Sequence, residues 1–365
     1  MKKIILVIES FELGGAERQA AYLAKELSKN NVYIVEVWAL NGEDGPVKTL
    51  LTNNNITCKS LGFDPRFLIH GNLFTSEYLK NLLKFLRFLV MNYANPKDTI
   101  ISYTYYPNFI FGLFRPVLST KKLIWNQRDE GRHFSGKFLE TIALSNAEEI
   151  ITNSSAGCLF LIQYTSRKIR LIHNGIPKQN NLSPNKTSNS FNVIMTANLH
   201  AFKDHQTLLM AWREFLQMNG FPQEAKLYLA GRRGDSYPAL KQMSDQFDII
   251  NHVTFLGGVA NIHDILPMMD VGVLSSLHEG MPNAILEYMQ HGLPVIATKL
   301  PGTIEIMGPE NEMLFGLKNY KELSKKIDML YKNKSLRILT GKKNQFLVNS
   351  MFSVETMVQN YTALL

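Results

Sequence analysis

Short apolar runs alternate with amphipathic helical segments along most of the chain. Residues 4–8 and 32–38 are apolar runs, and between them the segment 17–28 places its alanine and leucine side chains on one helical face. A continuous apolar run is typical of a strand that is buried on both faces of a parallel sheet. The pattern therefore predicts a strand–helix–strand unit at the N-terminus.

The same alternation resumes after an abrupt change in composition. Residues 178–192 are mostly Asn, Ser, Pro and Lys, whereas apolar runs return at 193–198, 225–230 and 253–257, with a short helix expected near 262–269. We interpret 178–192 as a linker. The chain is then α/β, with two doubly wound Rossmann-like domains that face an interdomain cleft. Their expected ranges are 1–177 and 193–349, and a helix at about 350–365 is expected to pack back on the first domain.

The segment 271–298 carries the clearest chemistry. An apolar run at 271–274 leads into a polar loop with Glu279, and a helix follows that we expect to begin at Pro282 and to end before Gly292. The start of such a helix, at the carboxyl edge of a parallel sheet, suits a phosphate or diphosphate. Glu279 and Glu287 lie roughly 7–8 Å apart along the axis. Both carboxylates are placed to accept hydrogen bonds from hydroxyls, for example a sugar on one side and a ribose on the other.

Composition narrows the class of protein. The chain has 365 residues, 45% of them apolar and 19% charged, which is typical of a globular protein with two cores. Its two cysteines are too few for a disulfide framework and lack metal-site spacing. The first apolar run ends at Glu9, too early for a signal peptide, and no run is long enough to span a bilayer. We therefore expect a cytoplasmic protein.

A net charge of +8 favours anionic partners. We expect no nucleic-acid partner, because no nucleic-acid-binding motif is present. In the Leu- and Phe-rich segment 73–93, Lys80, Lys84 and Arg87 share one face at spacings of four and three. This segment is either a core-packed helix with a solvated basic row or a surface that rests on anionic lipid. The second interpretation would place the protein peripherally at the inner face of the cell membrane.

Two further loops are candidate site segments. Gly14 and Gly15 form the first strand-to-helix turn, where paired glycines permit either a tight turn or the close approach of a ligand. Arg128 and Asp129 follow an apolar run, in a polar loop that can face a cleft.

Taken in order, these segments resemble retaining GT-B glycosyltransferases of glycosyltransferase family four. The resemblance covers almost the whole chain and includes the glutamate pair Glu279 and Glu287 with seven residues between them. The other matching segments are Gly14-Gly15-Ala16-Glu17, Asn174-Gly175-Ile176, Asn198-Leu199 with Lys203-Asp204-His205, Phe255-Leu256-Gly257, Gly292 to Thr298, and Pro301-Gly302-Thr303-Ile304-Glu305.

The resemblance implies a role for each matching residue. Glu279 would hydrogen-bond the donor sugar, Glu287 the ribose, and Lys203 would neutralise the departing diphosphate. The loop formed by Gly280, Met281, Pro282 and Asn283 would hold the diphosphate, the backbone at Leu256 would contact the nucleobase, and Gly14 and Gly15 would close against the donor phosphate or the acceptor. The reaction would need no metal and no cofactor besides its co-substrate, a UDP-linked nucleoside-diphosphate sugar. The sugar, a hexosyl or N-acetylhexosaminyl group, would pass with retention to a lipid-linked acceptor or a growing surface glycan such as capsule or O-antigen.

The sequence departs from the family pattern at two places. Many members have Gly-Arg where this chain has Ala197 and Asn198, so Arg128, Arg232 or Arg233 would have to replace the missing cation. Many members also carry a His where this chain has Gln127, Arg128 and Asp129. Two alternatives stay open: a nucleotide-sugar epimerase of the same fold, and a catalytically inactive nucleotide-sugar-binding subunit. Hydride transfer is disfavoured, because neither half contains a dinucleotide-binding fingerprint.

Overall fold

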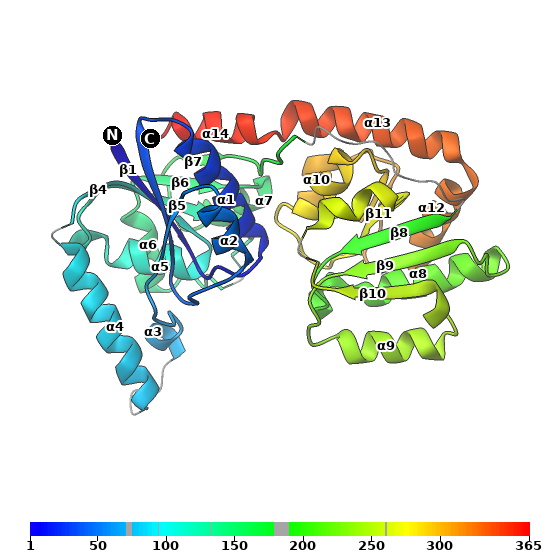
Figure 1. The fold of residues 1–365 in the computed structure, drawn as a ribbon, viewed down its shortest axis with the longest axis horizontal. Coiled ribbons are helices and arrows are strands. Elements are labelled where there is room, and N and C mark those ends of the chain that lie inside the picture. Colours follow the sequence, from blue (N-terminus) through cyan, green and yellow to red (C-terminus); the bar gives the residue numbers. More distant parts are fainter. Residues whose placement is uncertain (71–74, 94, 132, 179–189, 260) are drawn as a thin grey trace. The chain divides into compact units, whose positions relative to one another are not determined.

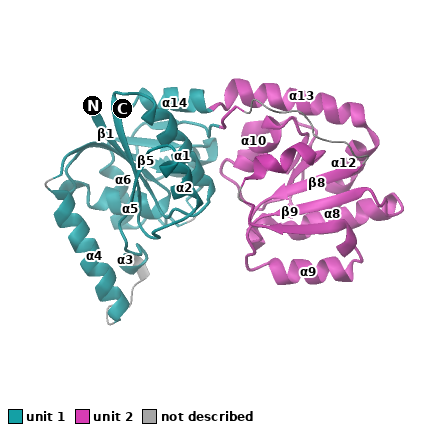
Figure 2. Ribbon diagram, viewed as in Figure 1, with its two compact units in different colours: residues 1–175, 354–365 teal, residues 176–353 magenta. Residues whose placement is uncertain are grey.

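The computed structural model describes residues 1–70, 75–93, 95–131, 133–178, 190–259 and 261–365. These residues form two compact units, one of residues 1–175 with 354–365 (unit 1) and one of residues 176–353 (unit 2) (Figure 2). Each unit contains a parallel sheet of the doubly wound type, which confirms the predicted α/β class. Of the predicted linker 178–192, residues 179–189 lie outside the described part of the chain.

The sheet of unit 1 has the strand order β3-β2-β1-β4-β5-β6-β7, with every described pairing parallel. Figure 1 labels β1, β4, β5, β6 and β7 of this sheet. Its strands are β1 (Lys2–Ile8), β2 (Tyr33–Ala39), β3 (Thr57–Ser60), β4 (Lys97–Tyr103), β5 (Thr120–Gln127), β6 (Glu149–Thr152) and β7 (Ile169–Leu171). The chain moves outward from β1 to β3 and then returns to the other side of β1 at β4. The carboxyl ends of β1 and β4 are therefore a topological switch point, where ligands commonly bind in such sheets.

Helices cover both faces of the unit 1 sheet because its central strand is apolar on both sides. On β1, Ile4, Leu6 and Ile8 belong to one buried cluster, and Ile5 and Val7 belong to another. The helices are α1 (Gly15–Ser28), α2 (Pro46–Thr52), α3 (Phe67–His70), α4 (Ser76–Tyr93), α5 (Tyr105–Leu113), α6 (Phe138–Ser145), α7 (Ser155–Leu161) and α14 (Val354–Thr362). Helix α14 contributes Met357 and Tyr361 to the same cluster as α1.

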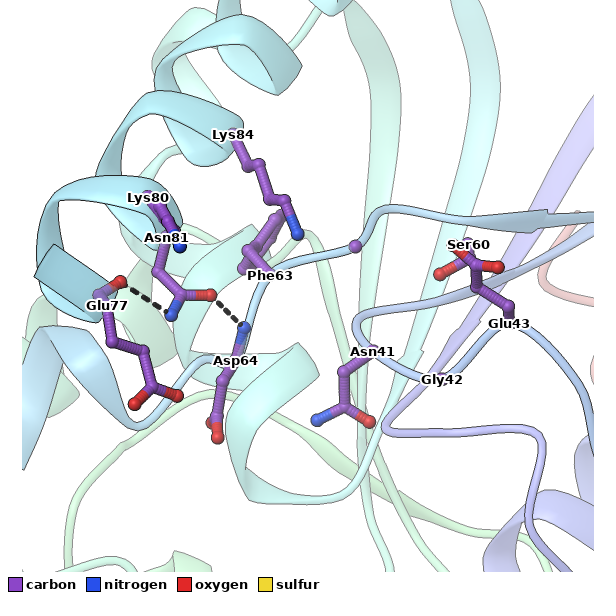
Figure 3. Close-up of a pocket in the computed structure, with 11 residues that line it drawn as sticks. Asn41, Gly42, Glu43, Ser60, Phe63, Asp64, Glu77, Lys80, Asn81 and Lys84 are labelled. Carbon is purple, nitrogen blue, oxygen red and sulfur yellow. Dashed lines mark hydrogen bonds between the residues drawn. The ribbon is translucent and has the colours of Figure 1, made fainter.

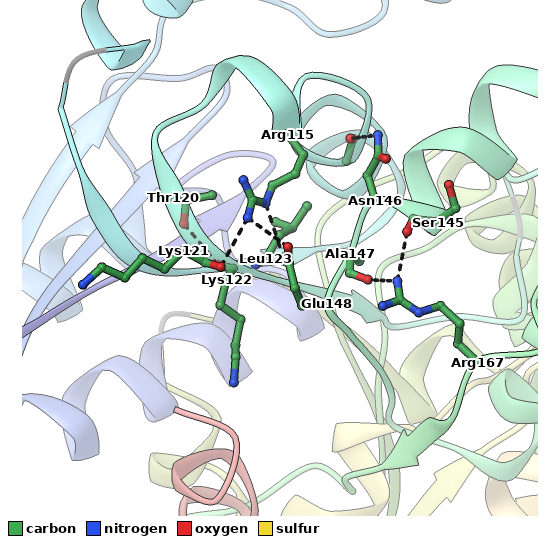
Figure 4. A network of polar contacts seen from close by, with 11 residues as sticks. Arg115, Thr120, Lys121, Lys122, Leu123, Ser145, Asn146, Ala147, Glu148 and Arg167 are labelled. Carbon is green, nitrogen blue, oxygen red and sulfur yellow. Dashed lines mark hydrogen bonds and ion pairs between the residues drawn. The ribbon is translucent and has the colours of Figure 1, made fainter.

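Polar contacts tie the start of β5 to the segments that precede β5, β6 and β7, at the amino edge of the sheet (Figure 4). Arg115 donates to a Glu148 carboxylate oxygen at 2.9 Å and to the Lys121 carbonyl at 3.2 Å, and Glu148 also accepts from the Leu123 N–H at 2.6 Å. Arg167 donates to the carbonyls of Ser145 and Ala147. This network lies at the edge opposite the switch point, so its role is structural.

The sheet of unit 2 has the order β10-β9-β8-β11-β12-β13, again with every described pairing parallel. Its strands are β8 (Phe191–Thr196), β9 (Ala225–Ala230), β10 (Val253–Gly257), β11 (Val271–Leu274), β12 (Val295–Thr298) and β13 (Leu314–Phe315). Its helices are α8 (His205–Met218), α9 (Tyr237–Gln246), α10 (Asn283–Gln290), α11 (Pro301–Met307), α12 (Tyr320–Lys332) and α13 (Lys334–Met351). One large cluster of buried apolar residues forms the core.

Several predicted boundaries need correction. Strand β8 begins at Phe191, inside the expected linker, because the Phe191 ring packs 5.9 Å from Phe215 in the core. The helix expected near 262–269 is instead two 3-10 turns, the second of which contains Pro267, a residue that removes a backbone donor. Helix α10 begins at Asn283, since Pro282 has extended backbone angles and stands at the cap. The C-terminal helix begins at Val354, after a break that follows α13.

Candidate functional site

The switch point of the unit 2 sheet lies between β8 and β11. These strands are neighbours, although β9 and β10 come between them in the sequence. The loops that follow them are joined directly: the Leu277 N–H donates to the Phe202 carbonyl at 2.8 Å, and the Ser275 hydroxyl donates to the Asp204 carbonyl at 2.9 Å. The fold thus brings two predicted site segments, 198–205 and 275–283, to one place at the carboxyl edge of the sheet.

An ion pair connects the two predicted catalytic residues. Lys203 ends a 3-10 turn, and its Nζ lies 2.6 Å from Oε1 of Glu279, whose side chain is 9% exposed. The Ser276 hydroxyl donates to the same carboxylate oxygen at 2.5 Å. Since Glu279 is held by two donors, its position and that of the Lys203 ammonium are fixed together. The pair places one cation and one hydrogen-bond acceptor beside each other, in the loops that follow β8 and β11.

Helix α10 carries the second predicted glutamate. Glu287 is buried, and the neighbouring Tyr288 accepts a hydrogen bond from the Thr196 N–H at 2.5 Å, which ties the helix to the end of β8. Burial raises the pKa of the Tyr288 hydroxyl, and the negative charges of Glu287 and Glu279 raise it further, although the hydrogen bond from Thr196 opposes both. Both carboxylates therefore act on the same tyrosine, and Tyr288 remains a neutral phenol at physiological pH.

The loop before α10 is in close contact with the start of α11. A Cβ atom built on Gly302 would lie 1.6 Å from the Gly280 carbonyl oxygen and 2.8 Å from that of Glu279. Only glycine fits at this position, because the backbones themselves meet there. The Thr303 hydroxyl holds the helix in place by donating to the Thr298 carbonyl at 2.5 Å. The backbone contact with α11 thus fixes the position of the loop that carries Glu279 and Gly280.

Asn198 has a structural contact that sequence reasoning missed. Its Oδ1 accepts a hydrogen bond from the Arg232 N–H at 2.9 Å, while the Leu199 N–H donates to the Arg232 carbonyl at 3.0 Å. Asn198 therefore fastens the basic turn 231–234 to the loop after β8. Arg233 stacks on Tyr237 at 4.5 Å, and both arginines lie at the same edge of the sheet as Lys203.

Two titratable residues, Asp204 and His205, directly follow Lys203 at the start of α8. Asp204 has left-handed backbone angles and caps α8, accepting from the Thr207 N–H at 3.3 Å. Burial raises the pKa of Asp204, and burial lowers the pKa of His205, which is 2% exposed, to about 4. His205 is therefore neutral at physiological pH, and its side chain is buried at the start of α8.

In unit 1 the predicted residues are held by local contacts. Arg128 donates to Asn174 Oδ1 at 2.5 Å and lies over the Tyr103 ring at 5.7 Å. Asp129 is occupied as an acceptor for the Gln127 amide at 2.7 Å and for the Gly131 N–H at 2.9 Å. Gly14 caps α1, and a Cβ there would lie 2.1 Å from a Glu17 carboxylate oxygen, so glycine makes room for that side chain. Gly15 is the exposed first residue of the helix.

A polar and aromatic cluster at the unit 1 switch point was not predicted. Glu9 follows β1, and Tyr106 lies near the start of α5 after β4; the Tyr106 ring stacks on His133 at 6.0 Å. Burial raises the pKa of Glu9, whereas the charges of Arg66 and His133 lower it. The sequence signal for this cluster is a charged residue, Glu9, directly after the first strand; Tyr106 and His133 come from segments that are distant in the sequence.

The described residues include no group of three or more His, Cys, Asp or Glu side chains arranged to hold a metal ion. That the reaction needs no metal remains a prediction from the family resemblance. Similarly, none of the helices in the described ranges combines the length and the apolar content that a bilayer-spanning segment needs.

Comparisons with known proteins bear on the family and on the fold. Residues 190–333 match the family model described as Glycosyl transferases group 1. An uncharacterized glycosyltransferase of Haemophilus influenzae is 23% identical over 377 aligned positions, which cover 100% of both chains. The N,N'-diacetylbacillosaminyl-diphospho-undecaprenol alpha-1,3-N-acetylgalactosaminyltransferase of Campylobacter jejuni is 30% identical over 120 residues, 33% of this chain and 31% of that one.

A solved structure matches the whole fold. The crystal structure of Anabaena HepE in complex with UDP and glucose aligns with a TM-score of 0.80 and 21% sequence identity, covering 100% of this chain and 99% of that chain. At this identity the likeness concerns the fold, which is the two-domain GT-B fold. The fold, together with the family model that matches unit 2, supports the conclusion that this protein is a glycosyltransferase.

Proposed function

We propose that the protein is a retaining glycosyltransferase that moves a hexosyl or N-acetylhexosaminyl group from a UDP-linked sugar to a lipid-linked or surface-polysaccharide acceptor. The observation that carries the proposal is the Lys203–Glu279 ion pair of 2.6 Å at the switch point between β8 and β11. The UDP and glucose named for HepE and the undecaprenol-linked substrate named for the Campylobacter enzyme support the donor and acceptor classes.

The proposed chemistry follows from where charge develops. As the bond between the anomeric carbon and the donor phosphate oxygen breaks, negative charge accumulates on the departing diphosphate. Lys203 and the positive end of the α10 helix dipole stabilise that charge. The acceptor oxygen forms the new bond to the anomeric carbon, and its proton passes to a phosphate oxygen of the leaving group. No protein base is then required.

The two glutamates position the donor in this proposal. Glu279 is largely buried yet borders the loop, and it accepts hydrogen bonds from sugar hydroxyls while still holding Lys203. Glu287 is 1% exposed. For Glu287 to bind the ribose, the residues around the start of α10 must therefore move enough to expose its carboxylate. Asn198 contributes indirectly, because it fastens the turn that presents Arg232 and Arg233. These arginines are the candidate replacements for the cation found in many relatives.

Measuring nucleotide release from UDP- and GDP-sugars, with and without bacterial membrane extract as the acceptor source, tests the proposal. We expect UDP release to depend on the extract, and Lys203→Met and Glu279→Gln to lower kcat by about 10²–10³-fold each. Lys332→Met is the matched control, since Lys332 forms an exposed ion pair of 2.8 Å with Asp328 on α12. It should keep wild-type turnover.

The outcomes separate the proposal from its two alternatives. An epimerase would convert the donor sugar without releasing nucleotide in proportion to the acceptor. An inactive binding subunit would bind UDP-sugar with no turnover under any condition. For the transferase, the anomeric configuration of the product, determined by NMR, should match that of the donor; inversion would contradict the retaining mechanism. Wild-type turnover of both site variants would show that the site assignment is wrong.

A further inference from the structure

Helix α4 packs against the rest of unit 1 through one face only. Phe85 and Phe88 are buried on that face, with Phe85 4.8 Å from Phe114 and Phe88 5.6 Å from Phe111 between ring centroids. These contacts belong to the buried cluster that covers one side of the sheet. The aromatic side chains of α4 therefore anchor the helix and account for its core-facing side.

The opposite face of α4 carries an apolar stripe that the fold leaves exposed. Leu79, Leu83, Leu86 and Val90 are 55%, 58%, 47% and 76% exposed. Their spacings of four, three and four place them in one row along the helix. Single exposed apolar residues are ordinary on protein surfaces, but a contiguous row marks an interaction site. The interpretation of this segment as simply core-packed is therefore incomplete.

A basic row runs beside the apolar stripe. Lys80, Lys84 and Arg87 are exposed, and none of them forms an ion pair with another described residue. Lys80 and Lys84 also line a cavity of about 360 Å³, in which Figure 3 shows the Lys84 amine directed toward the hollow. Because adjacent helical positions differ by about 100°, the basic row borders the stripe along one flank. An apolar face with flanking cations is the pattern of a helix that lies in a membrane interface.

We propose that α4 docks the protein on an anionic lipid surface, with the apolar stripe inserted and the basic row against the headgroups. Charge selects this partner over a second copy of the chain. The protein carries a net charge of +8, and Glu77 is the one acidic residue in the sequence of α4. Two copies that met through this face would bring two basic rows together, whereas an anionic surface neutralises them. The inference deepens the proposed lipid-linked acceptor, but its test does not depend on catalysis.

Vesicle co-flotation of the full chain tests the proposal. The probes are phosphatidylcholine vesicles with and without phosphatidylglycerol, at low and at physiological salt. We expect binding to the anionic vesicles only, weakened by salt. The variant K80E/K84E/R87E should lower the partition coefficient at least about 100-fold, since each cation contributes about fivefold near an anionic surface. The variant L83Q/L86Q/V90Q should also lower it at least tenfold, because the inserted area is lost.

A matched control separates the local surface from total charge. The variant K325E/K342E/K343E makes the same charge change at exposed lysines of α12 and α13 in unit 2. It should lower binding far less than the α4 variant, and all variants change exposed residues, so thermal unfolding should stay near wild type. Equal losses for both charge variants would overturn the proposal.

Other results also decide the matter. Binding of the basic-row variant at wild-type strength would overturn the proposal. A second result would also overturn it: the protein fails to float with anionic vesicles, and sedimentation shows a dimer that the variant L83Q/L86Q/V90Q dissociates. The apolar stripe would then be a contact between two copies of the chain. Vesicle binding without any sugar transfer would support the docking surface and contradict the proposed function alone.

Discussion

Replacing Gly302 with alanine tests whether α11 sets the position of the loop that carries Glu279. The backbone of Gly302 is helical, so alanine is compatible with its conformation. The new Cβ would lie 1.6 Å from the Gly280 carbonyl oxygen, whereas real Cβ contacts essentially never fall below 3.0 Å. The two segments must therefore separate by about 1.4 Å. Since Ile306 and Thr303 hold α11 in the core at 2% and 0% exposure, we expect the loop to move.

The displacement should affect stability and transfer differently. Crowding of this kind lowers the free energy of unfolding by about 1–3 kcal/mol. Because a misplacement of about 1 Å in a catalytic group can cost about 10²-fold, kcat/KM should fall by at least about 10²-fold. Urea unfolding measures the first effect, and UDP release with saturating acceptor extract measures the second. The loss of activity should persist at temperatures where the variant is fully folded.

A second glycine provides the control for this prediction. At Gly316 the nearest atom to an added Cβ is 3.6 Å away, an ordinary contact, and the residue is not among the glycines with positive φ. Gly316→Ala should therefore change the free energy of unfolding by less than about 1 kcal/mol and leave kcat/KM unchanged. If Gly302→Ala also matched the wild type in both assays, the inference that this backbone contact positions the loop would be refuted.

Two other predictions concern residues that support the site. Asn198→Ala removes the acceptor for the Arg232 N–H, so it should destabilise the protein by about 1 kcal/mol and raise the KM for the donor; Asn198→Asp, which keeps an acceptor oxygen, should retain more stability, and an alanine variant with unchanged KM would contradict the role of this contact. His205 has a folded-state pKa of about 4, below its ordinary value of 6.5, so only the unfolded chain gains its proton between those values. The free energy of unfolding should therefore fall as the pH drops from 6.5 toward 4, by up to about 1.4 kcal/mol per pH unit for this group. Urea titrations at pH 7.5 and 5 should show a smaller fall for His205→Gln, although His291, whose pKa is also lowered to about 4, keeps its own contribution; an equal fall would contradict the assignment.

Much of the fold was predictable because its signals are local. The strand expected at 225–230 is observed as Ala225–Ala230, and the helix expected from residue 17 begins two residues earlier, at Gly15. Predicted element boundaries were wrong where one residue departed from the pattern of its neighbours. Phe191 stands in a polar stretch that conceals its core contact, and Pro267 interrupts the helix expected near 262–269. These errors involve packing and lost backbone donors, which periodicity does not report.

By itself the sequence determined that the chain is α/β, and it identified the glutamate pair Glu279 and Glu287 together with Lys203 as candidate residues. Only the tertiary structure decided that Lys203 meets Glu279, a contact across 76 positions of the chain. The reason is strand order: β11 returns to the side of β8 after β9 and β10, and no local pattern encodes that return. The structure likewise decided that Asn198 fastens the basic turn and that α4 keeps an apolar row exposed, because burial depends on which neighbours the fold supplies.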